Sequence, residues 1–404
     1  MNKPLDGIRV VECAMFHAGP GASAIMGDMG AEVIKIEAPG IGDPLRGLMR
    51  IGSIPFELPG GRNIFFEGSN RNKKSITVDL MTDKGQEIVQ KLVMSADVFV
   101  TNMRRPAVKK MKISYNDFRK INPKLIYASV SAYGDKGPQR DQGGFDYQGQ
   151  ARSGLMYSMG EEGMPPIGCQ FGLVDQATAF NASHQVLAAL LARERFGGMG
   201  QEISVSILGS SMNMLYLNIL IELVTGMEVP RHKRTIEYPM RNHYQCKDGR
   251  WLMMTLTPPE RHWEPLCNAL EHPELLDDQR FATDDKRREN AELLVSIFDK
   301  IFETRCRDEW LQVFSKYDLF CCAINRLREL KNDSQIIENN YIVDFEHPVL
   351  GKIKIPGYPA HFSECDIKTI SAAPKLGEHT DEILSEICGY SDDEIKAMRE
   401  EEVI

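Results

Sequence analysis

Short runs of apolar residues alternate with amphipathic segments over the first half of the chain. Such runs predict buried strands, and the segments between them, such as 83–94, repeat apolar residues with helical spacing. The predicted strands lie at 8–14, 32–37, 75–80, 97–102, 125–132 and 202–207. Strands that alternate with helices form a parallel sheet covered on both faces, so we predict an α/β fold with a doubly wound, Rossmann-like domain.

The pattern changes after Gly226. Two short runs, 244–247 and 251–255, flank Asp248-Gly249 and predict a β-hairpin, and charge-rich helical segments follow. We therefore predict a second, smaller α+β domain. The predicted division is a large domain over 1–227 that ends in one long apolar helix at 210–225, a small domain over 228–330, and a return connection over 331–404 that packs on the large domain.

The stretch from Pro165 to Ile207 contains the most informative carboxylate. A Pro/Gly-rich loop leads to Asp175 and an apolar-periodic helix follows, so Asp175 is predicted at a helix N-terminus. The predicted buried face of that helix is Ala179, Ala182, Val186, Leu187, Leu190 and Leu191. One interpretation is an N-cap, because aspartate accepts hydrogen bonds from the first free amides of a helix. The other is a catalytic carboxylate, which the helix N-terminus would hold in place and keep ionised.

Composition excludes several classes of protein. The 404 residues carry a formal net charge of −9, which argues against general nucleic-acid binding. No apolar run reaches the length of a membrane span, and residues 1–4 lack the apolar core of a signal peptide, so no membrane association is expected. Nine cysteines without CxxC spacing indicate reduced thiols and a cytoplasmic protein. Nine histidines without HxH or HExxH spacing indicate no metal site.

Two basic clusters lie beside predicted strands. Their members are Arg71, Lys73 and Lys74 before one strand, and Arg104, Arg105, Lys109, Lys110 and Lys112 after another. A local cationic patch on an acidic protein suits a polyphosphate ligand, because such patches form charge-assisted hydrogen bonds. A solvated helix face is the alternative interpretation of the same pattern.

A glycine motif near the N-terminus supports a different hypothesis. Gly19, Gly21 and Ala24 match the G-x-G-x-x-A dinucleotide fingerprint, and Glu37 ends the second predicted strand where a ribose-binding acid would stand. This pattern is typical of NAD(P)-dependent dehydrogenases. Pro20 removes a backbone donor that a pyrophosphate would use, so the alternative is a tight turn that lets helix and strand pack closely.

Several separated motifs resemble the class III CoA-transferases, also called the CaiB/BaiF family, which includes formyl-CoA, carnitine and aryl-lactate CoA-transferases. The motifs are P-L-D-G-I-R-V at 4–10, A-G-P at 18–20, G-A-E-V-I-K-I-E at 30–37, G-D-P at 42–44, N-K-K-S at 72–75, the turn 134–138, G-F-D-Y at 144–147, the stretch 198–206, D-G at 248–249 and L-G-E-H-T at 376–380. Their order is kept over nearly the whole chain.

The resemblance implies a homodimer of interlocked, ring-like chains that moves CoA from an acyl-CoA to a free carboxylic acid, with no permanently bound cofactor. It implies that Asp175 is the nucleophile and forms an aspartyl anhydride and then an aspartyl-CoA thioester. Covalent steps of this kind conserve the activation energy of the thioester. The implied substrates are an acyl-CoA and a medium-sized carboxylate, such as a 2-hydroxy, aromatic or succinate-type acid.

The resemblance also assigns CoA contacts to particular residues. Ala18 would lie near the thioester. His17 would lie close to the reacting acyl group, where it either donates a hydrogen bond to an acyl oxygen or is a satisfied core histidine. The residues implied around the adenine and phosphates are Asn72, Lys74, Asn102, Arg104, Lys110 and Met111, with Lys136 nearby.

Two departures from the family pattern narrow the expected activity. Formyl-CoA transferase has a run of glycines before its small domain, whereas Glu237 to His243 contain none, so formyl and oxalyl substrates are not expected. Related 2-methylacyl-CoA racemases carry a His-Asp dipeptide where this chain has Phe145-Asp146, and racemisation needs a base on each face of the substrate. We therefore favour transfer, with a CoA-ester racemase or isomerase as the alternative.

Overall fold

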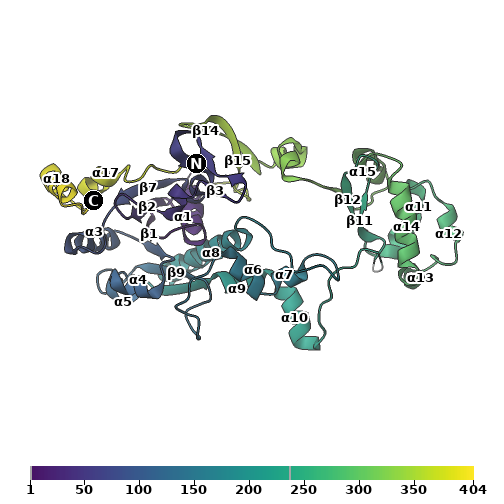
Figure 1. Cartoon of the computed structure of the whole chain (residues 1–404), viewed down its shortest axis with the longest axis horizontal. Helices are drawn as coiled ribbons and strands as arrows, with labels where there is room; N and C mark the ends of the chain where they lie inside the picture. The colour runs from purple at the N-terminus through teal and green to yellow at the C-terminus, as the bar shows by residue number, and fades with distance from the viewer. Residues whose placement is uncertain (1, 236–237) are drawn as a thin grey trace. The chain divides into compact units, whose positions relative to one another are not determined.

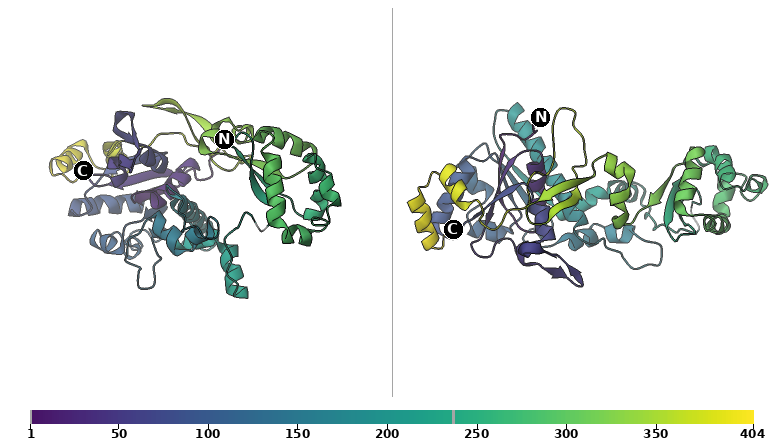
Figure 2. Two further views of the ribbon diagram at one scale, coloured as in Figure 1. Left: turned by 45° about the vertical axis from the view of Figure 1, so that its right-hand side comes forward. Right: turned by 90° about the horizontal axis from the view of Figure 1, so that it is seen from above.

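The computed structural model describes residues 2–235 and 238–404, which form two compact units (Figures 1 and 2). The larger unit comprises the chain up to Met156, Gly168–Glu228 and Asn340–Ile404. The smaller unit comprises Tyr157–Ile167 and Val229–Asn339. Both the first strands and the last helices therefore belong to the larger unit. The sequence-based boundaries after 227 and 330 stay predictions.

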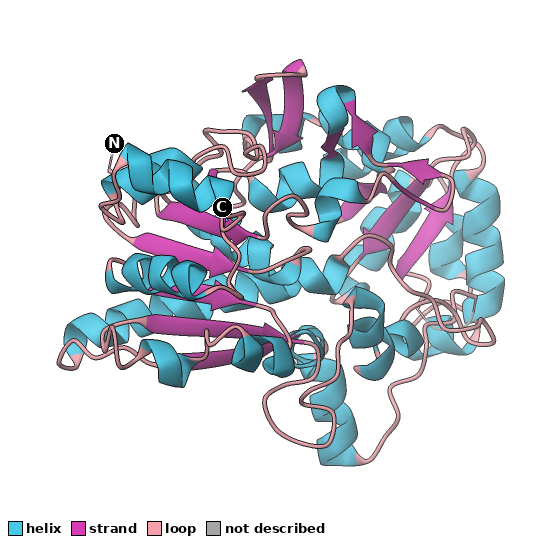
Figure 3. Cartoon of the chain, turned by 60° about the vertical axis from the view of Figure 1, so that its left-hand side comes forward, coloured by secondary structure: helices cyan, strands magenta, loops and turns pink. Residues whose placement is uncertain are grey.

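A six-stranded parallel sheet with helices on both faces forms the larger unit (Figure 3). Its strands, in spatial order, are β10 (Glu202–Ser206), β9 (Ile126–Ser131), β8 (Val98–Thr101), β1 (Arg9–Cys13), β2 (Glu32–Glu37) and β7 (Lys73–Thr77). The helices between them include α1 (Ala18–Asp28), α2 (Ile64–Asn70), α3 (Asp83–Met94), α4 (Arg105–Lys110), α5 (Tyr115–Phe118), α6 (Asp146–Arg152) and α8 (Leu173–Arg195). The predicted doubly wound α/β fold is confirmed.

The strand order places a topological switch point between β1 and β8. From β1 the chain proceeds to β2 and β7 on one side, and it returns through β8 to β9 and β10 on the other. The segments that leave β1 and β8 therefore diverge at the carboxyl edge of the sheet, where ligands bind in folds of this kind. Residues 14–17 and 102–104 lie at that edge.

Helices α1 and α8 pack closely because Gly21 of α1 has no side chain where the two helices meet. Every residue of α1 is buried, and a Cβ atom added to Gly21 would lie 3.0 Å from the Cβ of Ala179 in α8. A Cβ atom added to Gly19 would lie 3.0 Å from that of Ala14. The glycines of the dinucleotide-like motif thus serve close packing of α1 against its neighbours, but they lie in the first turn of the helix and not in the tight turn that the alternative interpretation expects.

A buried cluster of charges ties the centre of the sheet to the turn after β1. Lys35 Nζ lies 2.8 Å from Glu12 Oε1 and 3.0 Å from Asp43 Oδ2, and Lys73 Nζ lies 2.7 Å from Glu12 Oε2. All four side chains are buried. Burial alone would raise the pKa of Glu12, but the two ammonium groups lower it to about 2. Lys35 also donates to the carbonyl of Ala14, so the cluster fixes the start of the turn.

One predicted helix is in fact two. The predicted long helix over 210–225 is wrong: α9 (Ile207–Met214) and α10 (Tyr216–Thr225) meet at a bend of 76° at Leu215. No proline or glycine marks the break, and the apolar periodicity runs through it, so the sequence pattern does not reveal the bend. No single helix in the described part of the chain is long and apolar enough to cross a membrane, and only this bent pair meets the criteria when joined.

The C-terminal part of the chain completes the larger unit. It adds the hairpin β14 (Ile342–His347) and β15 (Gly351–Pro356), followed by α17 (Thr380–Glu386) and α18 (Asp392–Glu400). The smaller hairpins are β3 (Arg50–Ile51) with β4 (Ile54–Pro55) and β5 (Glu57–Leu58) with β6 (Arg62–Asn63). Figure 2 shows α17 and α18, in yellow, beside the sheet.

The smaller unit contains a three-stranded antiparallel sheet covered by helices. Its strands are β11 (Arg241–Gln245), β12 (Trp251–Thr255) and β13 (Cys321–Ile324), and its longer helices are α11 (Pro259–Ala269), α14 (Ala291–Phe302) and α15 (Arg307–Lys316). The predicted hairpin is present as β11 and β12. The segment from Glu237 to His243 contains no glycine; of this segment, Glu237 lies outside the described residues.

The buried charge cluster predicts a large loss of stability when one charge is removed. Lys35→Met leaves buried Asp43 without its ion-pair partner and Glu12 with only one of its two, so we expect it to lower the free energy of unfolding by about 3–5 kcal/mol. Urea unfolding followed by circular dichroism measures this. Tryptophan fluorescence reports separately on the smaller unit, because all three tryptophans lie there.

Lys354→Met is the matched control, because Lys354 pairs with Asp344 at 2.8 Å on the surface. We expect a much smaller change, close to the error of the measurement, because solvent screens this exposed pair. Equal effects of the two substitutions would contradict the stabilising role of the buried cluster.

Candidate active site

A cavity of about 650 Å³ opens at the carboxyl edge of the sheet. The turn after β1, the segment after β8, the turn before α6 and the first turn of α8 all contribute to its wall. Among its lining residues are Phe16, Ala18, Asn102, Arg104, Phe145 and Asp175. A second cavity of about 170 Å³ shares Met15 and Met103 with the first, so the two adjoin.

Asp175 lies in the first turn of α8 but does not cap it. The N-cap residue is Gly172, in a left-handed conformation with a φ of 78°, and it has no side chain to accept a hydrogen bond. The N-cap interpretation of Asp175 is therefore wrong. The helix begins at Leu173, two residues earlier than expected, because the glycine permits a turn directly before it.

The carboxylate of Asp146 caps α8 instead. Its Oδ2 accepts hydrogen bonds from the backbone amides of Val174 at 2.6 Å and of Asp175 at 3.0 Å. Gln150 in turn donates to the other oxygen of Asp146 and to the carbonyl of Cys169, and it accepts from the amide of Cys169. Asp146 and Gln150, both buried, thus fix the loop and the helix turn that carry Asp175.

The Asp175 carboxyl is poorly solvated and lies close to a like charge. Its Oδ1 atom is buried and has no hydrogen-bond partner among the described residues. Burial raises the pKa of Asp175 to about 7, and the Asp146 carboxylate adds to the rise. Burial thus opposes the helix N-terminus, which was expected to keep this group ionised, so the neutral and ionised forms are both populated near neutral pH. An ionised oxygen without hydrogen bonds at such a site is a strong nucleophile.

His17 has both ring nitrogens engaged. Nδ1 lies 2.7 Å from the hydroxyl of Ser69, and Nε2 lies 2.8 Å from Oε1 of Gln176. Because the amide oxygen of Gln176 only accepts, Nε2 carries the proton. Burial lowers the pKa of His17, which favours the neutral ring. The structure thus places His17 as a satisfied histidine beside the first turn of α8, and its contact with an acyl oxygen stays a prediction.

Three of the residues implied for CoA line the main cavity, and a fourth lines the small one. Ala18, Asn102 and Arg104 belong to the main cavity, and Met111 belongs to the small one. Asn102 also accepts from the amide of Met15 at 2.9 Å and donates to its carbonyl at 2.6 Å, so it shapes the turn after β1. Lys110 and Lys136 are exposed and line neither cavity.

Asn72 and Lys74 lie at the opposite edge of the sheet. They stand at the amino end of β7, whereas the cavities form at the carboxyl ends of the strands. Asn72 Oδ1 accepts from the amides of Ile370 and Ser371, and Lys74 pairs with Glu32 and Glu382. Their predicted contact with CoA is therefore not supported. Ligands bind at the carboxyl ends of parallel strands, so a basic residue that precedes a strand lies at the opposite edge of the sheet.

The sequence analysis missed the roles of Asp146 and Gln150. No local signal identifies them, because Asp146 caps a helix that begins 27 residues further along the chain. For metal ions, no group of three or more histidine, cysteine, aspartate or glutamate residues in the described parts of the chain is arranged to hold one.

Comparison with known proteins identifies the family. Residues 5–380 match CoA-transferase family III, so the chain belongs to that family. It is 32% identical over 400 residues to succinyl-CoA:glutarate CoA-transferase of Mus musculus. The match covers 98% of this chain and 89% of the relative. It is 31% identical to (R)-2-hydroxy-4-methylpentanoate CoA-transferase of Clostridioides difficile, with 99% of each chain covered.

A solved structure supports the same conclusion. A CaiB/BaiF family protein from Brucella suis superimposes with a TM-score of 0.86 at 29% identity, covering 96% of this chain and 100% of that one. The chain is thus an enzyme of the class III CoA-transferase family, and the resemblance seen in its sequence motifs is confirmed.

The like-charge contact predicts a change in the pH profile. If Asp175 acts in its ionised form, kcat/KM should rise with pH through a value near 7, where the raised pKa lies. Asp146→Asn removes a charge that raises this pKa, so we expect the acidic limb of the profile to move to lower pH. Asp141→Asn, on an exposed carboxylate, is the control and should leave the limb in place. If the acidic limb of the pH profile lay at the same pH in Asp146→Asn and in the unmodified enzyme, this role of Asp146 would be contradicted.

Proposed function

We propose that this enzyme transfers CoA from an acyl-CoA donor to a free carboxylic acid, with Asp175 as the covalent nucleophile. The observation that carries the proposal is a buried, unbonded carboxylate oxygen on a residue that lines a large cavity whose wall also holds arginines. Three of these, Arg104, Arg105 and Arg140, suit the phosphates of CoA because guanidinium groups bind phosphate in bidentate geometry.

The two adjoining cavities suit an extended ligand. The adenine of CoA fits the apolar lining of the small cavity, which includes Met111, Val78 and Leu80. The ribose and pyrophosphate would then pass Met15 and Met103, which both cavities share, and the pantetheine arm would cross the main cavity and bring the thioester to Asp175. The missing Cβ atoms of Gly143 and Gly144 in the wall let backbone atoms approach the reacting carbonyl.

The reaction proceeds by two acyl exchanges at Asp175. The Asp175 carboxylate attacks the thioester carbonyl, the C–S bond breaks, and CoA thiolate leaves a mixed anhydride. The thiolate then attacks the Asp175 carbonyl carbon and releases the donor acid as a carboxylate, which leaves an aspartyl-CoA thioester. The acceptor carboxylate repeats both steps in reverse, so no proton is gained or lost overall.

A racemase or isomerase is the second candidate, since Asp175 also fits the role of a base. Removing and returning an α-proton needs a second base on the opposite face of the substrate. The position that carries histidine in the related racemases is Phe145 here, and its ring lines the cavity. Phenylalanine cannot transfer a proton, which favours CoA transfer.

Mass spectrometry tests the nucleophile directly. Incubation with an acyl-CoA should add the mass of CoA, less water, to the intact protein, and hydroxylamine should remove it because a thioester reacts with it. Asp175→Ala should abolish the adduct, and activity should fall by at least about a thousandfold.

Asp135→Ala is the matched control, because Asp135 is an exposed carboxylate in the wall of the same cavity. The adduct should persist in this variant. An adduct that survives in Asp175→Ala, or α-proton exchange with solvent without any adduct, would overturn the proposal.

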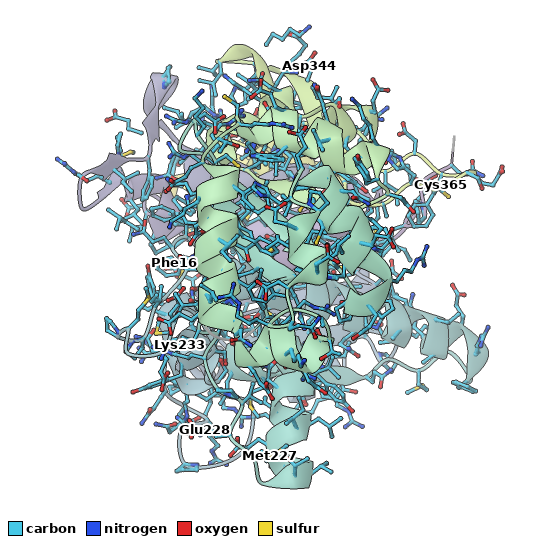
Figure 4. All side chains as sticks on the ribbon, turned by 90° about the vertical axis from the view of Figure 1, so that its right-hand side faces the viewer. Phe16, Met227, Glu228, Lys233, Asp344 and Cys365 are labelled. Carbon is cyan, nitrogen blue, oxygen red and sulfur yellow. The ribbon has the colours of Figure 1, made fainter. Side chains whose placement is uncertain are left out.

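We also propose that the enzyme is a homodimer of interlocked chains, and α10 supports this. The helix has no buried residue in the isolated chain, and its exposed apolar side chains include Tyr216, Leu217, Leu223 and Val224. Figure 4 shows the end of this helix, marked by Met227 and Glu228, projecting from the larger unit. Exposed apolar surfaces of this kind are typical of protein interfaces.

A charge on α10 should therefore disturb the dimer. Light scattering should give twice the mass of one chain for the unmodified protein, and Leu217→Glu should produce monomers or aggregates because it buries a charge at the interface. Met94→Glu places the same charge on an exposed apolar position of α3 and should leave the mass unchanged. A monomeric unmodified protein would refute the proposal.

A further inference from the structure

Five phenylalanines form an aromatic wall in the larger unit. They are Phe16, Phe56, Phe65, Phe145 and Phe171. The rings of Phe16 and Phe145 meet edge to face with centroids 5.4 Å apart. The other three contact one another, since the Phe171 ring lies 5.8 Å from both Phe56 and Phe65. Phe16 and Phe65 pack against the same buried cluster, which joins the two groups.

The aromatic wall flanks the proposed nucleophile. Phe16 and Phe145 line the same cavity as Asp175, and Phe16 is labelled in Figure 4. Phe171 directly precedes Gly172, the N-cap of α8. A Cβ atom on Gly172 would lie 3.7 Å from the Cβ of Asp175 and equally far from the ring of His17. The Phe16 and Phe145 rings therefore border the space open to an acyl group at Asp175, and Phe171 stands next to the N-cap of the helix that carries Asp175.

Two members of the wall are held in a strained backbone conformation. Phe16 has a φ of 62° and Phe171 a φ of 64°, in the left-handed region that bulky residues avoid. Glycine would adopt this conformation without cost. Phe171 is 44% exposed and Phe145 is 59% exposed, so much of their surface lies outside the core. Strain together with exposed aromatic surface next to a reactive group indicates contact with a ligand.

Three cations near His17 and Phe66 are already paired with carboxylates. Arg71 pairs with Asp28, Lys73 with Glu12, and Arg46 with Glu37. These three are therefore not free to pair with a second carboxylate of a substrate. The arginines of the main cavity are assigned above to the phosphates of CoA.

We propose that the acid carries an uncharged apolar side group, either aryl or branched alkyl, and that the aromatic wall binds this group. The inference rests on the CoA transfer proposed above and names its substrate class. Ring contacts of this kind favour an aromatic or branched side group. A side group that ends in a second carboxylate, as in succinate or glutarate, would lose its hydration on entering.

Isotope exchange tests the substrate class without knowledge of the natural donor. Each acyl-CoA is incubated with its own ¹³C-labelled free acid, and label entering the thioester is measured by mass spectrometry. We compare 3-phenylpropanoate and 4-methylpentanoate with succinate and glutarate. Exchange should be at least about tenfold more efficient for the two apolar acids, which is the effect expected of one or two ring contacts.

Phe171→Gly tests the aromatic wall itself. It should reduce exchange of 3-phenylpropanoate by about tenfold more than exchange of succinate. Glycine relieves the left-handed strain but loses the ring contacts with Phe56 and Phe65, so the protein should stay folded with only a small change in melting temperature. Asp318→Gly is the matched control, since Asp318 has a φ of 53° in the smaller unit, and it should not alter the ratio between acids.

The outcomes separate this inference from the proposed function. Exchange that favours succinate or glutarate overturns the inference and leaves CoA transfer intact. An equal loss of exchange for all acids in Phe171→Gly has the same meaning. An Asp175 adduct without exchange of either apolar acid also overturns the inference alone. Absence of both adduct and exchange for every acid overturns the proposed function.

Discussion

The ion pairs that Lys35 and Lys73 make with Glu12 and Asp43 link the core of the larger unit to its ligand-binding edge. Lys35 holds the carbonyl of Ala14, Asp43 accepts from the amide of Phe16 at 3.2 Å, and Lys73 holds the carbonyl of Pro20. These contacts fix the turn after β1 and the first turn of α1. A buried ion pair is weak evidence for stability, but its directional bonds specify one conformation, and here that conformation forms the wall of the cavity.

The first turn of α8 depends on a second polar arrangement. Asp146 replaces the missing N-cap side chain, and Gln150 ties Asp146 to the loop before the helix. Asp146 thus serves two purposes, since it positions the Asp175 backbone and raises the pKa of the Asp175 carboxyl. The site combines a fixed backbone with a poorly solvated carboxyl, which is the combination that nucleophilic catalysis by a carboxylate requires.

The features that the sequence predicted are those set by local patterns. The strand at 32–37 and the helix at 83–94 agree residue for residue with β2 and α3, because a continuous apolar run and an uninterrupted period define them. Asp175 and Arg104 were placed at the cavity by motif resemblance. The cap formed by Asp146, the bend at Leu215 and the engagement of Asn72 by residues 370–371 depend on tertiary partners, so no local pattern encodes them.

The arrangement of the chain has a consequence for the order of folding. The smaller unit is continuous in sequence except for Tyr157–Ile167, and its aromatic core lies within residues 240–319. The core of the larger unit instead includes Val11 near one end of the chain and Val403 near the other. During synthesis the smaller unit can therefore assemble while the central sheet still lacks its last partners, so completion of the larger unit depends on contacts of very high sequence separation.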